Sequence, residues 1–194
     1  LKTEGLAAAD GGLMLLVCAH SLGVAPILLS GSVTHLRRVL MPAFRASERG
    51  EPHLFAFAIT EPAAGSDAEE GHRASAYAPG CIARRGEVGF LLRGRKVFIS
   101  GGDVAKQTVV FAALEGEGME SWTAFLVDRN ARGCEVARTE WKMGMRASGA
   151  AELALDDVFV GDARVVGDVR GGWALNRATL NLSRIPVAGM AVGF

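Results

Sequence analysis

The chain has 194 residues, of which 49% are hydrophobic and 22% charged, and 21 basic side chains balance 21 acidic ones. This composition is typical of a globular protein large enough to bury a core, and it excludes a disordered chain. The zero net charge removes the long-range attraction that draws proteins to nucleic acid or anionic membranes, so we expect neither as a partner.

The three cysteines, Cys18, Cys81 and Cys134, lie far apart and form no CxxC pair. An odd number of scattered cysteines argues against a disulfide framework and against a zinc site. We therefore expect reduced thiols in a cytoplasmic protein, most of them ordinary core residues.

Residues 1–52 are predicted to form an N-terminal helical segment, because apolar residues recur at spacings of three and four. Gly11 and the glycine after it interrupt the first pattern, and Pro26 is expected to open a new helix. Ser32 is a plausible N-cap for the helix that follows.

The stretch Leu13–Leu29 is the one membrane candidate that we find in the sequence. It is short for a membrane span and carries His20, Ser21, Gly23 and Pro26, so we interpret it as a buried helix. It also lacks the basic flank and cleavage site of a secretory signal, which favours an intracellular location.

Residues 53–165 change to short apolar runs separated by Gly, Asp and Asn, the pattern of β-strands joined by turns. Spacing this regular predicts a small antiparallel barrel or sandwich. The expected strands are Leu54–Thr60, Val88–Leu92, Lys96–Ser100, Thr108–Leu114, Thr123–Val127, Glu135–Arg138 and Glu152–Val158.

Residues 166–194 return to a helical pattern, which Pro186 is expected to kink. The whole chain is therefore predicted to be of the α+β class, with N-terminal helices, a central β domain and the start of a C-terminal helical bundle. The helical face exposed at the end of the chain is apolar and has no evident partner in the sequence.

One stretch, Phe57–Asp67, combines a buried strand with a loop of small and hydroxyl residues. Pro62 ends the pairing of the strand, so the amides from Ala63 to Ser66 need other partners. Small side chains let an anion approach such amides, although a plain turn explains the same residues about as well.

The stretch Thr60–Asp67 resembles the Thr-Glu-Pro-x-Ala-Gly-Ser-Asp signature of the acyl-CoA dehydrogenases, FAD enzymes that desaturate acyl-CoA thioesters. Two further family motifs follow in the expected order. Gly94–Ser100 is similar to the Gly-x-Lys-x-(Trp/Phe)-Ile-(Thr/Ser) strand, and Lys142–Ser148 with Leu155–Val160 is similar to a Lys-x-Gly-x-Arg-x-Ser and Asp-Asp-Val pair. Members of this family are roughly twice as long as this chain.

The resemblance implies that FAD lies against the two motif strands, where donors stabilise negative charge on the reduced flavin. It assigns the backbones of Phe57 and Ile59 and the hydroxyl of Thr60 to the pyrimidine edge of the flavin. It assigns Gly65 and Ser66 to the pyrophosphate and the Ser100 hydroxyl to flavin N5. Phe98 stands where many members have Trp. The implied cofactor residues are Phe57, Ile59, Thr60, Gly65, Ser66, Phe98, Ile99 and Ser100.

The resemblance also implies an acyl-CoA substrate, with Ser66 and Arg184 near it, and a mechanism of proton abstraction coupled to hydride transfer to the flavin. A minority of members place a glutamate base immediately before the motif arginine, where this chain has Ser183. A serine cannot serve as that base, so we expect no catalytic residue among these 194. Glu61, Asp67, Lys142 and Arg146 are interpreted as structural.

The implied partners are an electron acceptor such as another flavoprotein and further copies of the chain in a dimer or tetramer. Two alternatives stay open at this point. A flavin oxidase or monooxygenase relative would share the same strands, and a non-catalytic binding or assembly protein on the same scaffold would need no base.

Overall fold

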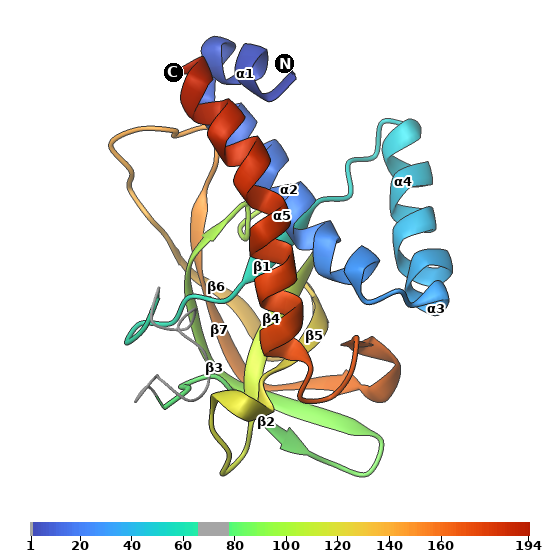
Figure 1. Ribbon diagram of the computed structural model, residues 1–194. Helices are drawn as coiled ribbons and strands as arrows, with labels where there is room; N and C mark the ends of the chain where they lie inside the picture. The colour runs from blue at the N-terminus through green and yellow to red at the C-terminus, as the bar shows by residue number, and fades with distance from the viewer. Residues whose placement is uncertain (1, 66–77) are drawn as a thin grey trace.

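The computed structural model describes residues 2–65 and 78–194 and shows a chain of the α+β class, as predicted (Figure 1). The helices are α1 (Lys2–Ala9), α2 (Gly11–Leu29), α3 (Val33–His35), α4 (Met41–Glu48) and α5 (Gly172–Gly193). A π-helical turn, Leu36–Leu40, joins α3 to α4. The strands are β1 (Phe55–Ala58), β2 (Ile82–Arg85), β3 (Gly89–Ser100), β4 (Gln107–Leu114), β5 (Thr123–Asp128), β6 (Cys134–Thr139), β7 (Ala150–Gly161) and β8 (Val165–Val166).

The strands form one sheet in the order β6-β7-β3-β2-β4-β5-β8, with β1 paired to β4. Among the described residues five strand pairs are antiparallel, as expected, whereas β1 and β2 both run parallel to β4. Parallel neighbours need a crossover connection, and the chain between β1 and β4 provides one. Two expected strands merge into the long β3, while β2 and β8 were not predicted.

Alternate residues of β1, β4 and β5 point to opposite sides of the sheet, as the period of two in a strand requires. One side packs within the curved sheet against β3 and β7, around Ala56, Val110, Phe125, Ile99 and Leu153. The other side packs against the helices, around Phe57, Phe111, Leu126, Ile27 and Leu40. The sheet is therefore buried on both faces at its centre.

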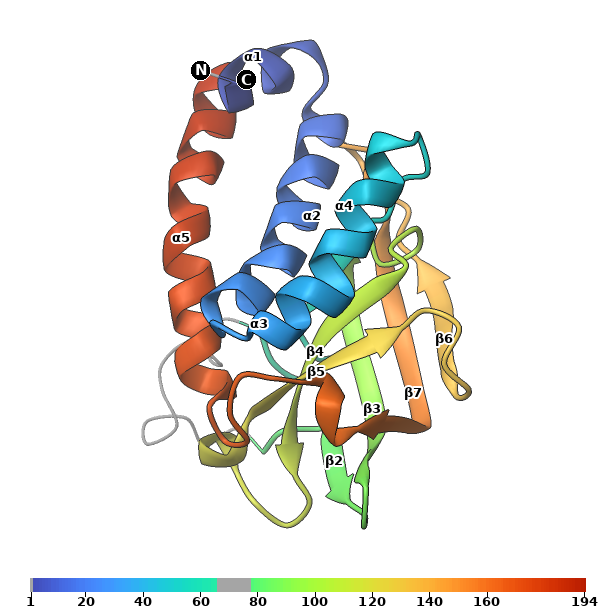
Figure 2. The same cartoon turned by 90° about the vertical axis from the view of Figure 1, so that its right-hand side faces the viewer.

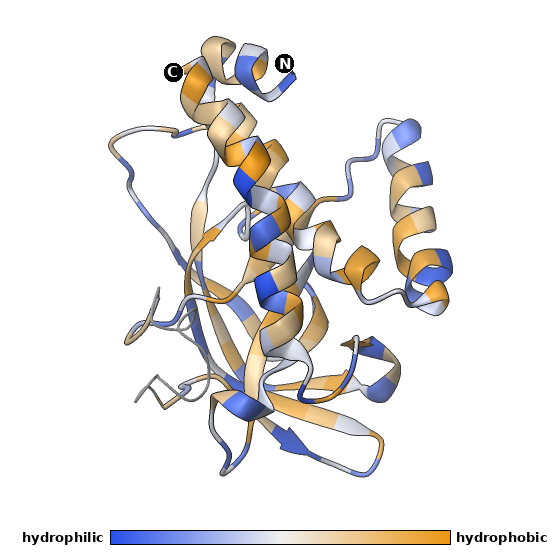
Figure 3. Ribbon diagram, viewed as in Figure 1, coloured by the Kyte–Doolittle hydropathy of each residue, from blue (hydrophilic) through white to orange (hydrophobic). Residues whose placement is uncertain are grey.

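The helices lie on one side of the sheet, with α2 and α5 next to one another and α1 across their far ends (Figure 2). Pro26 lies inside α2 and does not open a new helix, and α2 packs against β1 and α5. The α2 helix is apolar along most of its length (Figure 3). It is the one helix in the described part of the chain that is long and apolar enough to cross a membrane, and 44% of it is buried inside the structure.

Two glycines set how closely the helices approach the sheet. A Cβ atom on Gly23 of α2 would lie 2.7 Å from the backbone of Phe55, and one on Gly172 of α5 would lie 2.7 Å from the backbone of Trp122. Both helices therefore rest directly on main chain at these points. This close packing places the middle of α2 against the start of β1, the strand that leads into the first sequence motif.

Candidate functional site

A cavity of about 170 Å³ opens where the ends of β1 and β3 meet α2 and α5. Six of the eight predicted cofactor residues line it, although they come from two motifs about 40 residues apart in the chain. These six are Phe57, Ile59, Thr60, Phe98, Ile99 and Ser100. The helices close the cavity with Ala19, Leu22 and Leu180, which sequence reasoning did not identify.

Two hydrogen bonds fix the end of β1 against β3. The Val97 amide donates to the Thr60 carbonyl at 2.9 Å, and the Lys96 ammonium donates to the Ile59 carbonyl at 2.8 Å. The segments that carry the two sequence motifs are therefore joined by main-chain and side-chain bonds directly beside the cavity.

Phe98 adopts a backbone conformation that is rare for an aromatic residue. Its φ angle is +58°, and the register between β3 and β7 shifts by one residue between Lys96 and Ile99, which marks a β-bulge. The bulge leaves the Phe98 side chain 61% exposed at the cavity while its neighbours on both sides are buried. Strain of this kind is concentrated at functional sites, because a binding surface can require an orientation that a regular strand does not give.

The loop after β1 is a tight turn around Pro62. The Ala64 amide donates to the Glu61 carbonyl at 3.2 Å, and the Glu61 amide donates to the Ala64 carbonyl at 2.9 Å. The expectation that the Ala64 amide is available to an anion is therefore wrong, because the turn itself uses it. Gly65 is exposed and lies next to Thr60, and Ser66, predicted for both cofactor and substrate, lies outside the described residues.

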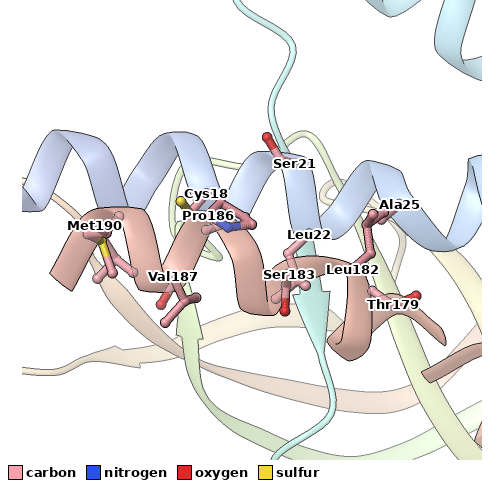
Figure 4. A pocket seen from close by; sticks show the side chains of 13 residues that line it. Cys18, Ser21, Leu22, Ala25, Thr179, Leu182, Ser183, Pro186, Val187 and Met190 are labelled. Atoms are coloured by element: carbon pink, nitrogen blue, oxygen red, sulfur yellow. The ribbon is translucent and has the colours of Figure 1, made fainter. Parts of the chain in front are cut away.

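A second, apolar cavity of about 180 Å³ lies between α2 and α5 (Figure 4). Leu22 and Ala25 of α2 face Leu182 and Val187 of α5 across it, and Ser183 adds a hydroxyl. The second cavity shares Ala19, Leu22 and Ser100 with the first, so the two adjoin at the end of β3.

The polar groups around the second cavity give it little reactivity. Burial raises the pKa of the Cys18 thiol, which lines the cavity and is therefore a poor nucleophile. Among the described residues, neither cavity has an aspartate or glutamate in its lining. The Ser183 hydroxyl donates to the Leu180 carbonyl at 2.8 Å.

Arg184, predicted to lie near the substrate, is exposed on α5 and lines neither cavity. Its Nε donates to Asn181 Oδ1 at 3.4 Å. The preceding residue, Ser183, lines the second cavity, and the role of Arg184 near the substrate stays a prediction. A shift of one position on a helix turns a side chain by about 100°, which accounts for the difference.

Two of the charged motif residues, Glu61 and Arg146, bind loop backbone, while Asp67 lies outside the described residues. Glu61 is buried, and its carboxylate accepts hydrogen bonds from the Gly80 amide at 2.6 Å and the Cys81 amide at 3.2 Å. In the loop between β6 and β7, Arg146 donates to the Lys142 carbonyl at 2.9 Å and lies over the ring of Trp141.

The match to known families settles what these motifs belong to. Residues 56–158, more than half of the chain, match the model of the acyl-CoA dehydrogenase middle domain. The chain belongs to the acyl-CoA dehydrogenase family. The resemblance seen in the sequence motifs is thereby confirmed, and the matched span includes β1 from Ala56 onward, all of β3 and the six predicted cofactor residues of the first cavity.

Three related proteins agree with this assignment. A caffeyl-CoA reductase-Etf complex subunit from Acetobacterium woodii is 31% identical over 90% of this chain and 43% of its own length. Butyryl-CoA dehydrogenase from Megasphaera elsdenii superposes with a TM-score of 0.86 at 31% identity, over 98% of this chain and 47% of that structure. An acyl-CoA dehydrogenase from Bacillus anthracis, complexed with FAD, superposes with a TM-score of 0.83 at 28% identity, over 98% of this chain and 30% of that structure. The chain thus spans about half or less of these acyl-CoA dehydrogenase relatives.

Proposed function

We propose that this chain provides the flavin- and acyl-binding surfaces of an FAD-dependent acyl-CoA dehydrogenase. The observation that supports this most strongly is the cavity at the ends of β1 and β3. It gathers six residues that the sequence motifs alone assign to flavin.

The chemistry of this cavity suits a flavin ring. The strained, exposed Phe98 offers an aromatic face, and the hydroxyls of Thr60 and Ser100 offer donors to ring heteroatoms. When bound, FAD supplies the hydride acceptor of the reaction. The backbones of Phe57 and Ile59 and the Thr60 hydroxyl would hold its pyrimidine edge, and the Ser100 hydroxyl would reach flavin N5.

The adjoining cavity between α2 and α5 suits an acyl chain. Its lining is predominantly aliphatic, which favours an apolar tail and excludes water from it. Because Ser100 belongs to both cavities, the reacting carbons of a bound acyl group would lie at this junction, with the tail between Leu22 and Leu182.

Removal of the proton α to the thioester requires a base, and the described cavity linings contain no carboxylate. The residues described here therefore bind and orient the reactants and exclude water, and they do not abstract the proton. Ser183 occupies the cavity-facing position on α5 from which a carboxylate could reach the junction.

A second candidate function is the reverse reaction, reduction of an α,β-unsaturated acyl thioester. The Acetobacterium woodii relative is a subunit of a caffeyl-CoA reductase-Etf complex and is 31% identical to this chain. This similarity supports reduction as an alternative to dehydrogenation. The same relative supports an electron-transfer flavoprotein as the redox partner of this chain.

Visible spectroscopy tests the proposal. The chain is incubated with FAD, freed of excess by gel filtration, and examined before and after anaerobic addition of short-, medium- and long-chain acyl-CoA. We expect a yellow protein whose flavin band shifts with one class of acyl-CoA. A colourless protein, with no flavin retained, would contradict the proposal and leave the non-catalytic scaffold as the better account. A shift of the flavin band with an unsaturated acyl-CoA, without any response to a saturated one, would favour the reductase.

A further inference from the structure

Lys96 carries a fully buried charge next to the flavin cavity. Its Nζ lies 2.8 Å from the Ile59 carbonyl oxygen, 2.8 Å from Glu61 Oε1 and 5.5 Å from the centre of the Trp122 ring. Lys96 itself is 0% exposed. Replacing a buried ion pair by apolar residues of similar volume is often neutral or stabilising, so stability alone is a weak reason for this pair.

The ammonium acts on the peptide group that lines the cavity. The Ile59 carbonyl and the Thr60 N–H belong to the same peptide unit, and both residues line the flavin cavity. A cation bonded to the carbonyl oxygen polarises the unit and makes its N–H a stronger donor, and this effect is larger in a buried environment. Within the described part of the chain the Thr60 N–H has no acceptor.

The two charges of the pair have different further partners. Lys96 binds Ile59, which lines the flavin cavity, whereas Glu61 also binds the amides of Gly80 and Cys81, which do not. The positive end of the pair is therefore directed toward the cavity and the negative end toward β2. An oriented pair of this kind favours negative charge that develops in the cavity.

We propose that Lys96 is a positioning residue that polarises the Ile59–Thr60 peptide toward the flavin, and that the oriented Lys96–Glu61 pair raises the reduction potential of the bound cofactor. This inference rests on the proposed function, because it needs FAD in the cavity. Its physical basis is that reduced flavin carries negative charge at the edge that the β1 end would hold, whereas oxidised flavin is neutral.

The test uses two variants with opposite expected effects on the potential of bound FAD, measured by dithionite titration against a reference dye. Glu61→Gln leaves the cation uncompensated and should raise the potential. Lys96→Met with Glu61→Gln removes both charges and should lower it, while the amide oxygen of the introduced glutamine takes the place of one carboxylate oxygen and accepts from one of the two amides, Gly80 or Cys81. We expect a change of about tenfold in the ratio of reduced to oxidised flavin in each direction, the size of one hydrogen bond to a charged group, which is about 30 mV for a two-electron couple.

Arg95→Met is the matched control, because Arg95 is the neighbour of Lys96 on β3 but is largely exposed and pairs with Glu152. It should leave the potential unchanged. Thermal unfolding of each variant separates a stability effect from an electrostatic one, since a purely structural pair would lower the melting temperature of both variants without moving their potentials apart.

Equal potentials in wild type and both variants would overturn the inference and leave the proposed function intact. Failure of the wild-type chain to bind FAD would overturn both. If the double variant does not fold, Glu61→Gln alone decides, because an unchanged or lower potential in that variant contradicts the proposal.

Discussion

Replacing Gly23 by alanine should destabilise the protein, although alanine is the better helix former. The new Cβ would lie 2.7 Å from the Phe55 carbonyl carbon and 2.8 Å from the Ala56 nitrogen. This is about 0.8 Å inside the optimal separation of ~3.5 Å, and main-chain atoms of a fully buried strand cannot easily move aside. Overpacking of this kind costs about 3 kcal/mol at the upper end of its range, while the gain in helix propensity returns about 1 kcal/mol.

The net loss of about 2 kcal/mol corresponds to a melting temperature lower by about 4–8 °C for a chain of this size. Circular dichroism at 222 nm during heating measures it directly. Gly5→Ala is the matched control, because Gly5 is an exposed interior residue of α1 and a Cβ there would meet nothing within 4 Å. The control should raise the melting temperature by about 2–4 °C for a gain of about 1 kcal/mol. An equal rise in both variants would refute the reasoning that α2 rests directly on β1.

Three further predictions concern titration, thiol reactivity and catalysis. Burial lowers the pKa of His20, of His35 and of His53 below the ordinary 6.5. The nearby charge of His53 lowers the pKa of His20 further, and His20 Nδ1 accepts a hydrogen bond from the Phe55 amide. The unfolded chain therefore takes up protons first, so the free energy of unfolding should fall as the pH drops through 6.5, and a flat profile from pH 7 to pH 5 would contradict this. Burial also raises the pKa of Cys81 to about 11. Cys81 should therefore not react with a thiol reagent at pH 8 until the protein is unfolded. Rapid labelling of Cys81 in the folded protein would be inconsistent with the core described here. Ser183→Glu should place a carboxylate base at the junction of the two cavities and allow an acyl-CoA to bleach bound flavin. Ser183→Gln is the isosteric control and should not allow bleaching. Equal behaviour of the two variants would show that position 183 does not reach the substrate.

The fold class and most strands could be predicted from the sequence because their signals are local. The apolar runs of β4 and β5 and the cap at Ser32 depend on a few adjacent residues. Pairing partners are not local, and for that reason the parallel alignment of β1 and β2 with β4 was not predicted. The short β2 contains two arginines in four residues, and such a strand has no apolar pattern to detect.

The candidate site was predictable where motifs carry it and not where helices complete it. Thr60, Phe98 and Ser100 were identified by their motifs, but nothing in the sequence indicated that Phe98 stands on a bulge with a positive φ angle. Leu22 and Leu180 have the apolar character of any buried helical residue, so no local signal marks them as cavity residues. The role of Arg184 was assigned by motif position, and only the orientation of α5 shows that Ser183 faces the cavity.

Binding of FAD is the measurement that tests the central claim most directly. FAD is titrated by fluorescence with the wild-type chain, with Thr60→Val and with Ser100→Ala, and each variant lacks one hydroxyl of the cavity. Thr139→Val, on the exposed β6, is the control. The account predicts saturable binding by the wild type, a loss of affinity of about two- to tenfold in each cavity variant, as expected for one hydrogen bond, and no change in the control. Equal affinity in all four proteins, or no binding by a wild-type chain that is folded, would contradict the assignment of this cavity to flavin.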